Sequence, residues 1–323
     1  MKYLAIAAAL VSATSPLTVS AQANIAAERA AFDALMERVN RLPDTPGDGP
    51  YPSLIEQVAD LPNHVIYRPA DMAAIGPDEL GVLVWGNGAC AADGTSTRFH
   101  LSQIASYGYV VIAPGLRRSG PEATAPAEPP RSLGPDGQMP SSPTDAAQLI
   151  EALDWVLAQN GTSGSIYHGL IDENALAAAG FSCGGVQALT VAGDPRLDTV
   201  VVQNSGLLPA GAPRLGGMGL PKEGLLALHT PVLYLDGGPT DIAYANGLDD
   251  YGRIDHVPAF WVNTPTGHGG TYHDPMGGRN ASIVVDWLEW QLRGDAGAAR
   301  TFIGANCRLC TDPVATIEFK NLD

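Results

Sequence analysis

Residues 175–191 read ALAAAGFSCGGVQALTV, and this stretch of the 323-residue chain decides the fold. Its first half is a run of small apolar residues typical of a buried strand, and its second half is spaced like a helix. Ser182 lies at the junction, with Gly180 and Gly184 two positions away on either side. A serine on so tight a turn needs small residues at those positions, and the turn lifts its hydroxyl above the sheet edge. The stretch therefore predicts a strand, a nucleophile and a helix in direct succession.

Strand-like and helix-like segments alternate on both sides of this turn. Strands are predicted at 64–68, 81–85, 109–113, 175–181, 199–203, 231–236 and 259–262, and helices at 25–42, 98–107, 145–159, 183–191 and 281–293. Thr144 is the expected capping residue of the helix at 145–159. Such alternation builds a parallel sheet that helices cover on both faces. No repeat or linker divides the sequence, so we expect one domain of the α/β class.

The composition argues against several classes of protein. The chain has 34 acidic and 18 basic residues, a formal charge of −16, and no basic run. This balance argues against nucleic acid or an anionic membrane as the main partner. Apolar residues make up 45% of the sequence, which argues against a disordered chain.

The N-terminus has the pattern of a secretory signal peptide. Lys2 precedes an apolar run, and Ala21-Gln22-Ala23 matches a small-residue cleavage site. We therefore expect a signal peptide at 1–23, a single domain over 24–323, and a secreted or periplasmic protein. No later stretch is long and apolar enough to predict a membrane span.

Two candidate partners of Ser182 follow it in the sequence. Asp241 lies on the turn after a strand that ends at Asp236, and His268 lies in a glycine-rich loop after the last predicted strand. We prefer Asp241 to Asp236 because an acid beyond the strand end can reach the second ring nitrogen of a histidine. The order serine, aspartate, histidine is that of an α/β hydrolase.

The other histidines offer weaker alternatives. His273 competes with His268 for the catalytic role, and the two together could be read as a metal site. Their spacing on a loop is not specific for a metal, so we expect no metal. The remaining histidines, among them His64 and His100, are expected mostly at the surface.

The loop after the strand at 81–85 reads Trp85-Gly86-Asn87-Gly88-Ala89-Cys90. An oxyanion hole needs two backbone N–H groups, one from the residue after the nucleophile and one from this loop. We therefore predict Cys183 and Asn87 as donors, with Gly88 as the next choice. Trp85 and Gly88 are candidates for the substrate pocket, although Trp85 could instead close the end of the sheet.

The four cysteines are expected to form two disulfides in an oxidising compartment. Cys90 and Cys183 lie on the two loops that must meet at the oxyanion hole, so a bond between them would hold that hole in place. Cys307 and Cys310 would then pair locally. Their C-x-x-C spacing also occurs in redox and zinc sites, but the predicted signal peptide favours a structural bond.

One long segment interrupts the alternation. Residues 116–143 contain seven prolines and follow the carboxyl end of a strand, where α/β sheets bind ligands. Arg117, Arg118 and Arg131 within it either help to bind an anionic group of a substrate or are solvated. A second irregular segment covers 204–228.

The chain resembles the α/β-hydrolase superfamily in four features: the strand-to-helix turn, or elbow, at Gly180–Gly184, the Trp85–Cys90 loop, Asp241 and His268. Within it, the chain is similar to secreted members of the dienelactone hydrolase, platelet-activating-factor acetylhydrolase and polyester hydrolase group, whose G-x-S-x-G-G pattern Gly185 completes. The resemblance implies an eight-stranded, mostly parallel sheet and hydrolysis of carboxylic esters without a cofactor. The chain departs from many relatives by Trp85, where they have histidine, and by a cysteine after the nucleophile.

These observations predict a secreted serine esterase. Ser182 would attack the ester carbonyl, His268 would act as general base, and Asp241 would orient the histidine ring. The partner would be a small-molecule or polymer ester. Two alternatives stay open, namely a peptidase or amidase with the same triad, and a non-catalytic binding protein with the hydrolase fold.

Overall fold

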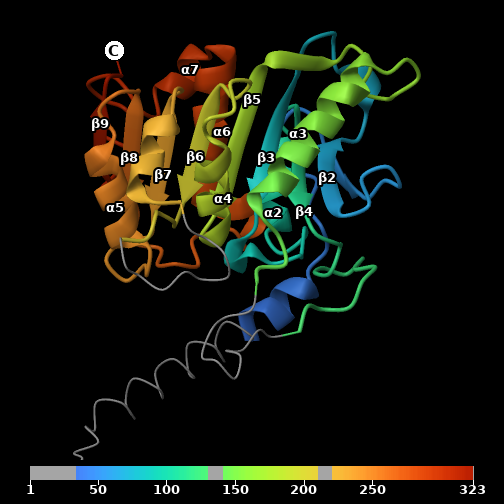
Figure 1. The fold of residues 1–323 in the computed structure, drawn as a ribbon, viewed down its shortest axis with the longest axis horizontal. Helices are drawn as coiled ribbons and strands as arrows, with labels where there is room; N and C mark the ends of the chain where they lie inside the picture. Colours follow the sequence, from blue (N-terminus) through green and yellow to red (C-terminus); the bar gives the residue numbers. More distant parts are fainter. Residues whose placement is uncertain (1–33, 130–140, 210–219, 323) are drawn as a thin grey trace, which may run out of the picture. The chain divides into compact units, whose positions relative to one another are not determined.

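Figure 1 shows the computed structural model, which describes residues 34–129, 141–209 and 220–322. The predicted signal peptide at 1–23 and the predicted start of the domain at residue 24 lie outside these residues, so both stay predictions.

The chain divides into two compact units, residues 1–42 and 43–323. The described part of the first unit holds a helix over residues 34–40, within the helix predicted at 25–42. All strands of the described residues belong to the second unit.

Nine strands of the second unit form a single sheet in the order β1-β2-β4-β3-β5-β6-β7-β8-β9 among the described residues. Their bounds are Ser53–Glu56 (β1), His64–Pro69 (β2), Leu80–Gly86 (β3), Tyr109–Pro114 (β4), Ile171–Phe181 (β5), Thr199–Gln203 (β6), Val232–Asp236 (β7), Ala259–Asn263 (β8) and Thr316–Lys320 (β9). The strands from β4 to β8 in this order are parallel, and the remaining neighbours at both ends are antiparallel. The predicted α/β class with a mostly parallel sheet is confirmed.

The sheet has more strands than the sequence predicted. The eight strands implied by the resemblance are wrong in number, because the described residues contain nine. The two strands without a prediction, β1 and β9, lie at the edges of the sheet. Each is short and partly exposed, so neither has the continuous apolar run that marks the inner strands.

Helices cover both faces of the sheet (Figure 1). Their bounds are Arg98–Ala105 (α2), Ala146–Gly161 (α3), Cys183–Val191 (α4), Tyr244–Arg253 (α5), Gly278–Arg293 (α6) and Ala296–Ala299 (α7). Residues of α3 and α4 belong to the apolar cluster on one face, and residues of α2 and α6 to the cluster on the other. Among the described residues, no helix has the length and apolar character needed to cross a membrane.

The start of α3 differs from the prediction. Asp145, not Thr144, caps this helix, because its carboxylate accepts from the backbone N–H of Ala147 (3.0 Å) while Gln148 accepts from the N–H of Asp145 (3.1 Å). Thr144 is buried and donates through Oγ1 to the carbonyl of Cys90 (3.0 Å). The threonine therefore joins the start of α3 to the loop after β3.

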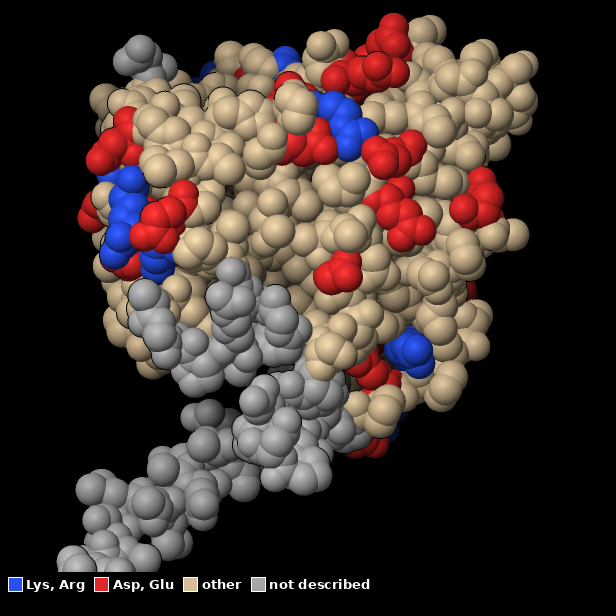
Figure 2. All heavy atoms as spheres, viewed as in Figure 1, with Lys and Arg blue, Asp and Glu red and all other residues tan. Residues whose placement is uncertain are grey.

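Basic side chains of the second unit are largely paired. On the face drawn in Figure 2, they are few, and several lie beside acidic ones. Arg196, for example, bonds to both Asp154 (2.6 Å) and Asp194 (2.7 Å), and Lys320 bonds to Asp255 (2.9 Å). The excess acidic residues therefore dominate the charge of this surface.

Strand β7 ends on a buried carboxyl group. Asp236 is 0% exposed, and its Oδ2 accepts from the indole N–H of Trp261 (2.7 Å). Burial raises the pKa of Asp236 to about 8, against the opposing effect of the Trp261 hydrogen bond and with the help of the nearby negative Asp241 and Asp250. The carboxyl group is therefore neutral at neutral pH in the folded protein.

This buried acid predicts a pH-dependent stability. From about pH 4, where an unfolded aspartate ionises, to about pH 8, the folded chain holds a proton that the unfolded chain has lost. The free energy of unfolding therefore falls as pH rises through this window. We expect Asp236→Asn to raise Tm relative to wild type by an amount that grows between about pH 5 and pH 8.

A matched control is Asp60, which also accepts from a tryptophan, Trp155 (3.0 Å), but at the exposed surface. For Asp60→Asn, the difference in Tm from wild type should stay constant across the same range, as measured by thermal denaturation in parallel buffers. A constant difference for Asp236→Asn as well would contradict the prediction.

Candidate active site

The turn between β5 and α4 holds Ser182 in a backbone conformation that is rare for non-glycine residues. Its φ and ψ are 54° and −120°, and α4 begins at the next residue, Cys183. Its N–H donates to the carbonyl of Gln203 (3.0 Å), and its carbonyl accepts from the N–H of Gly185 (2.9 Å). A strained residue that the surrounding backbone fixes in this way is typical of functional sites.

Close backbone contacts explain the glycines of this elbow. A Cβ added to Gly180 would lie 2.1 Å from the carbonyl oxygen of Gly184, and one added to Gly184 would lie 1.9 Å from that of Gly86. Both distances are far below contact, so glycine is required at these positions. The same approach brings the loop after β3 against the first turn of α4.

Three predicted residues come together at this edge of the sheet. His268 Nδ1 donates to Asp241 Oδ1 (2.6 Å), and Ser182 Oγ donates to His268 Nε2 (3.0 Å). The Asp241 side chain is fully buried, whereas the His268 side chain is 27% exposed. Because the Asp241 carboxylate can only accept, the ring proton lies on Nδ1, and Nε2 is left to accept the serine proton.

Asp241 is held in its charged form. Burial raises its pKa, but hydrogen bonds from His268, from the N–H of Ala243 and from Asn204 outweigh that effect, and the pKa of Asp241 lies below its usual value. Asp236, the alternative acid, is neutral and bonded to Trp261, as described above. Asp241 is therefore negatively charged and Asp236 is uncharged, so only Asp241 can stabilise a histidine cation.

The other histidines lie in different surroundings. Burial lowers the pKa of His273 to about 4, with a contribution from the positive charge of Arg98. Of the five other histidines, His168, His229 and His256 are exposed, so the expectation that most lie at the surface is confirmed, whereas His64 and His100 are fully buried. His64 bonds to the carbonyl of Gln148 (2.9 Å) and the His100 ring packs against Trp85, and a pattern of hydrophobicity alone hides such positions. Within the described residues, no group of three or more His, Cys, Asp or Glu side chains could hold a metal ion.

The loop after β3 is fixed by the side chain of Asn87. This amide is buried and donates to the carbonyls of Ala91 (2.9 Å) and Pro114 (2.7 Å). The backbone nitrogen of Asn87 would lie 2.7 Å from a Cβ on Gly184, so it lies against the start of α4. The N–H groups proposed for the oxyanion hole therefore belong to two backbones in contact.

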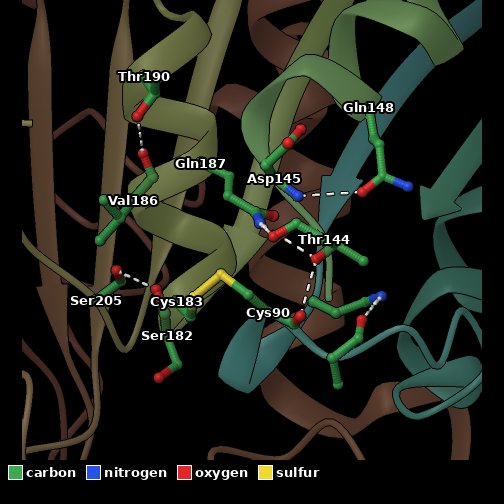
Figure 3. The surroundings of a disulfide bond; sticks show 12 residues. Cys90, Thr144, Asp145, Gln148, Ser182, Cys183, Val186, Gln187, Thr190 and Ser205 are labelled. Atoms are coloured by element: carbon green, nitrogen blue, oxygen red, sulfur yellow. Dashed lines mark hydrogen bonds between the residues drawn. A yellow bond between two sulfur atoms is a disulfide. The ribbon is translucent and has the colours of Figure 1, made fainter. Parts of the chain in front are cut away.

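Both predicted disulfides are confirmed. Cys90 is bonded to Cys183, with their Cα atoms 5.2 Å apart, and Cys307 is bonded to Cys310. Figure 3 shows that the first bond joins the loop after β3 to the residue that follows Ser182. Thr144, which donates to the carbonyl of Cys90, accepts at its own carbonyl from Gln187 of α4 (3.0 Å).

The candidates for substrate contact fall into two groups. Trp85 is 0% exposed and packs against His100 and Tyr272, with ring centroids 5.3 and 6.5 Å away, so it closes the end of the sheet and does not line an open pocket. Gly88 lies beside the nucleophile turn, since a Cβ there would be 2.5 Å from the ring of Phe181. The Phe181 ring in turn lies 5.3 Å from that of His268, a contact the sequence did not predict.

Arg117 and Arg118 of the segment 116–143 form hydrogen bonds and ion pairs within the protein. Arg117 bonds to Asp44 (2.6 Å) and Glu122 (2.8 Å), while Arg118 donates to the carbonyls of Ala92 (2.9 Å) and Pro126 (2.6 Å). Neither of the two alternatives, an anion site or solvation, describes them well. The third arginine, Arg131, lies outside the described residues.

Comparison with known proteins adds no identification. No protein-family model matches the chain, and a search of the curated proteins finds no match. The class of the protein therefore rests on the fold and on the geometry of the residues around Ser182.

The Cys90–Cys183 bond predicts a large contribution to stability. It closes a loop with a sequence separation of 93, which restricts the unfolded chain strongly. We expect the Cys90→Ala/Cys183→Ala double variant to lose about 2–4 kcal/mol of unfolding free energy in chemical denaturation.

The second disulfide provides the control. Cys307 and Cys310 are separated by only 3 positions, so Cys307→Ala/Cys310→Ala should lose clearly less. Peptide mapping without reduction checks the pairing directly, and finding Cys90 and Cys183 as free thiols would refute it.

Proposed function

We propose that this chain is a serine hydrolase of the α/β-hydrolase superfamily that cleaves carboxylic esters, secreted or exported to the periplasm. The observation that carries the proposal is the hydrogen-bonded series from Ser182 Oγ through the two ring nitrogens of His268 to Asp241, at the carboxyl end of parallel strands. The two disulfides support an oxidising compartment.

The reaction would begin at Ser182. As its oxygen attacks the ester carbonyl, His268 Nε2 takes the hydroxyl proton, and Asp241 stabilises the resulting imidazolium through Nδ1. The carbonyl oxygen, now negatively charged, would accept from the backbone N–H groups of Cys183 and Asn87. Both groups lie on segments that the Cys90–Cys183 bond joins, which supports a preorganised oxyanion hole.

Three further proton transfers complete the cycle. His268 gives its proton to the leaving alcohol, and the acyl group stays on Ser182 as an ester. A water molecule then attacks this acyl-enzyme while His268 removes its proton, and Ser182 recovers a proton as the acid departs. The similarity of the elbow and of the Trp85–Cys90 loop to esterases favours an ester over an amide substrate.

The proposal predicts that activity depends on one hydroxyl group. We expect wild type to hydrolyse p-nitrophenyl esters and to react covalently with a fluorophosphonate, and Ser182→Ala to lose at least about 10³-fold in kcat/KM together with the labelling. Ser163→Ala, an exposed serine in the connection between α3 and β5, is the control that should keep both.

The same assay separates the alternatives. A series of acyl lengths, with aryl, sugar and polyester substrates beside peptide anilides, compares ester with amide hydrolysis. Faster cleavage of the anilides would identify a peptidase or amidase. Folded protein that neither labels nor hydrolyses any of these substrates would favour a binding protein.

A further inference from the structure

Three consecutive residues at the end of β6, Gln203 to Ser205, form hydrogen bonds with Ser182 and Asp241. Gln203 accepts at its carbonyl from the N–H of Ser182 (3.0 Å), and Ser205 Oγ donates to the carbonyl of Ser182 (2.5 Å). Between them, Asn204 Nδ2 donates to Asp241 Oδ2 (2.8 Å). None of these residues belongs to a recognisable motif in the sequence, although they form a polar stretch at the end of a buried apolar strand.

Asn204 donates hydrogen bonds through both protons of its side-chain amide. The second bond goes to the carbonyl of Gly267, the residue before His268 (3.1 Å). Its φ is 45°, a left-handed conformation that asparagine tolerates better than most residues, and it is 0% exposed. A single side chain therefore ties the acid to the loop that carries the histidine.

Tyr272 bonds to the other end of the Asn204 amide. Asp241 Oδ2 and the Gly267 carbonyl can only accept, so the NH₂ group faces them, and the Tyr272 hydroxyl donates to Asn204 Oδ1 on the opposite side. The tyrosine ring is fully buried and packs against Phe181 and His100, with centroids 4.5 and 5.2 Å away, so its hydroxyl has little freedom.

The two oxygens of Asp241 have different donors. Oδ1 accepts from His268 Nδ1 (2.6 Å) and from the N–H of Ala243 (2.9 Å), whereas Oδ2 accepts from Asn204 Nδ2 (2.8 Å) and from the N–H of Gly237 (3.1 Å). Rotation of the carboxylate would break all four bonds. Since Asn204 is the side-chain donor on Oδ2, it fixes the direction in which Oδ1 meets the histidine.

We propose that Asn204 and Tyr272 are positioning residues that hold the Asp241 carboxylate, and through it the His268 ring, in the reactive orientation. This inference rests on the proposed function. The ionisable groups that face Asp241 are His268, Tyr272 and the neutral Asp236. Asn204 thus places an uncharged donor on a carboxylate whose charge is needed when His268 becomes a cation.

Asn204→Gly tests the inference without backbone strain, because glycine adopts positive φ freely. We expect kcat for a p-nitrophenyl ester to fall ~10- to 100-fold with little change in KM, since one hydrogen bond to a charged group is lost. Asn160→Ala is the matched control. Asn160 also bonds through both ends of its amide, to Glu173 and Ile171, but its kcat should equal that of wild type.

Tyr272→Phe removes only the hydroxyl group, so it tests the inference even if Asn204→Gly fails to fold. We expect a smaller loss of kcat, ~3- to 10-fold, because Asn204 Oδ1 then loses its donor and the amide is held less firmly. The Asn204→Gly/Tyr272→Phe double variant should be no slower than Asn204→Gly, since both act through one amide. In the Asp241→Asn background, neither change should lower kcat further by more than ~3-fold.

A spectroscopic measurement separates this inference from the proposed function. In a ¹H spectrum, the proton between His268 Nδ1 and Asp241 can be assigned by its absence in His268→Ala. It should shift or broaden in Asn204→Gly and in Tyr272→Phe but not in Asn160→Ala, whether or not an ester is turned over. An unchanged resonance and unchanged kcat in both variants would overturn the inference. Wild type that fails to label with fluorophosphonate would instead overturn the proposed function.

Discussion

The contact of backbone against backbone at Gly86, Gly180 and Gly184 is the constraint on which the rest of the site depends. It lets the first turn of α4 lie directly on the loop after β3, at distances that no side chain would permit. Ser182 can then project its hydroxyl from the sheet edge, and Cys183 comes within bonding distance of Cys90. Without this approach, the loop after β3 would lie apart from Ser182, and Cys90 could not reach Cys183.

Around this contact, the protein buries several polar side chains that form hydrogen bonds between segments of the site. Asn87 fixes the loop after β3, Thr144 joins the start of α3 to the same loop, and Asn204 joins Asp241 to the residue before His268. Such bonds are strong in a medium that excludes water, and each is costly to leave unmade. These buried hydrogen bonds therefore hold the loops at this edge of the sheet in place.

The sequence predicted the inner strands, the elbow and the three aligned side chains because each has a local pattern. A strand of small apolar residues, a glycine two positions from a serine and a histidine in a glycine-rich loop are visible without a structure. The edge strand β9 and the buried His100 were missed, since their roles depend on neighbours distant in sequence. The cap of α3 is a local pattern of Asp145 and Gln148, which the choice of the adjacent Thr144 overlooked. Asn204 belongs to this group as well, because its partners lie 37 and 63 positions away.

The Cys90–Cys183 bond also shapes the unfolded chain. It closes a covalent ring that contains α2, β4, α3 and β5, so denaturation without reduction leaves the ends of this ring together. When such a chain refolds, the loop after β3 and the segment of the nucleophile do not have to find each other by diffusion. Asp241 and His268 lie outside this ring, so their segments still have to be brought to Ser182 as the chain folds.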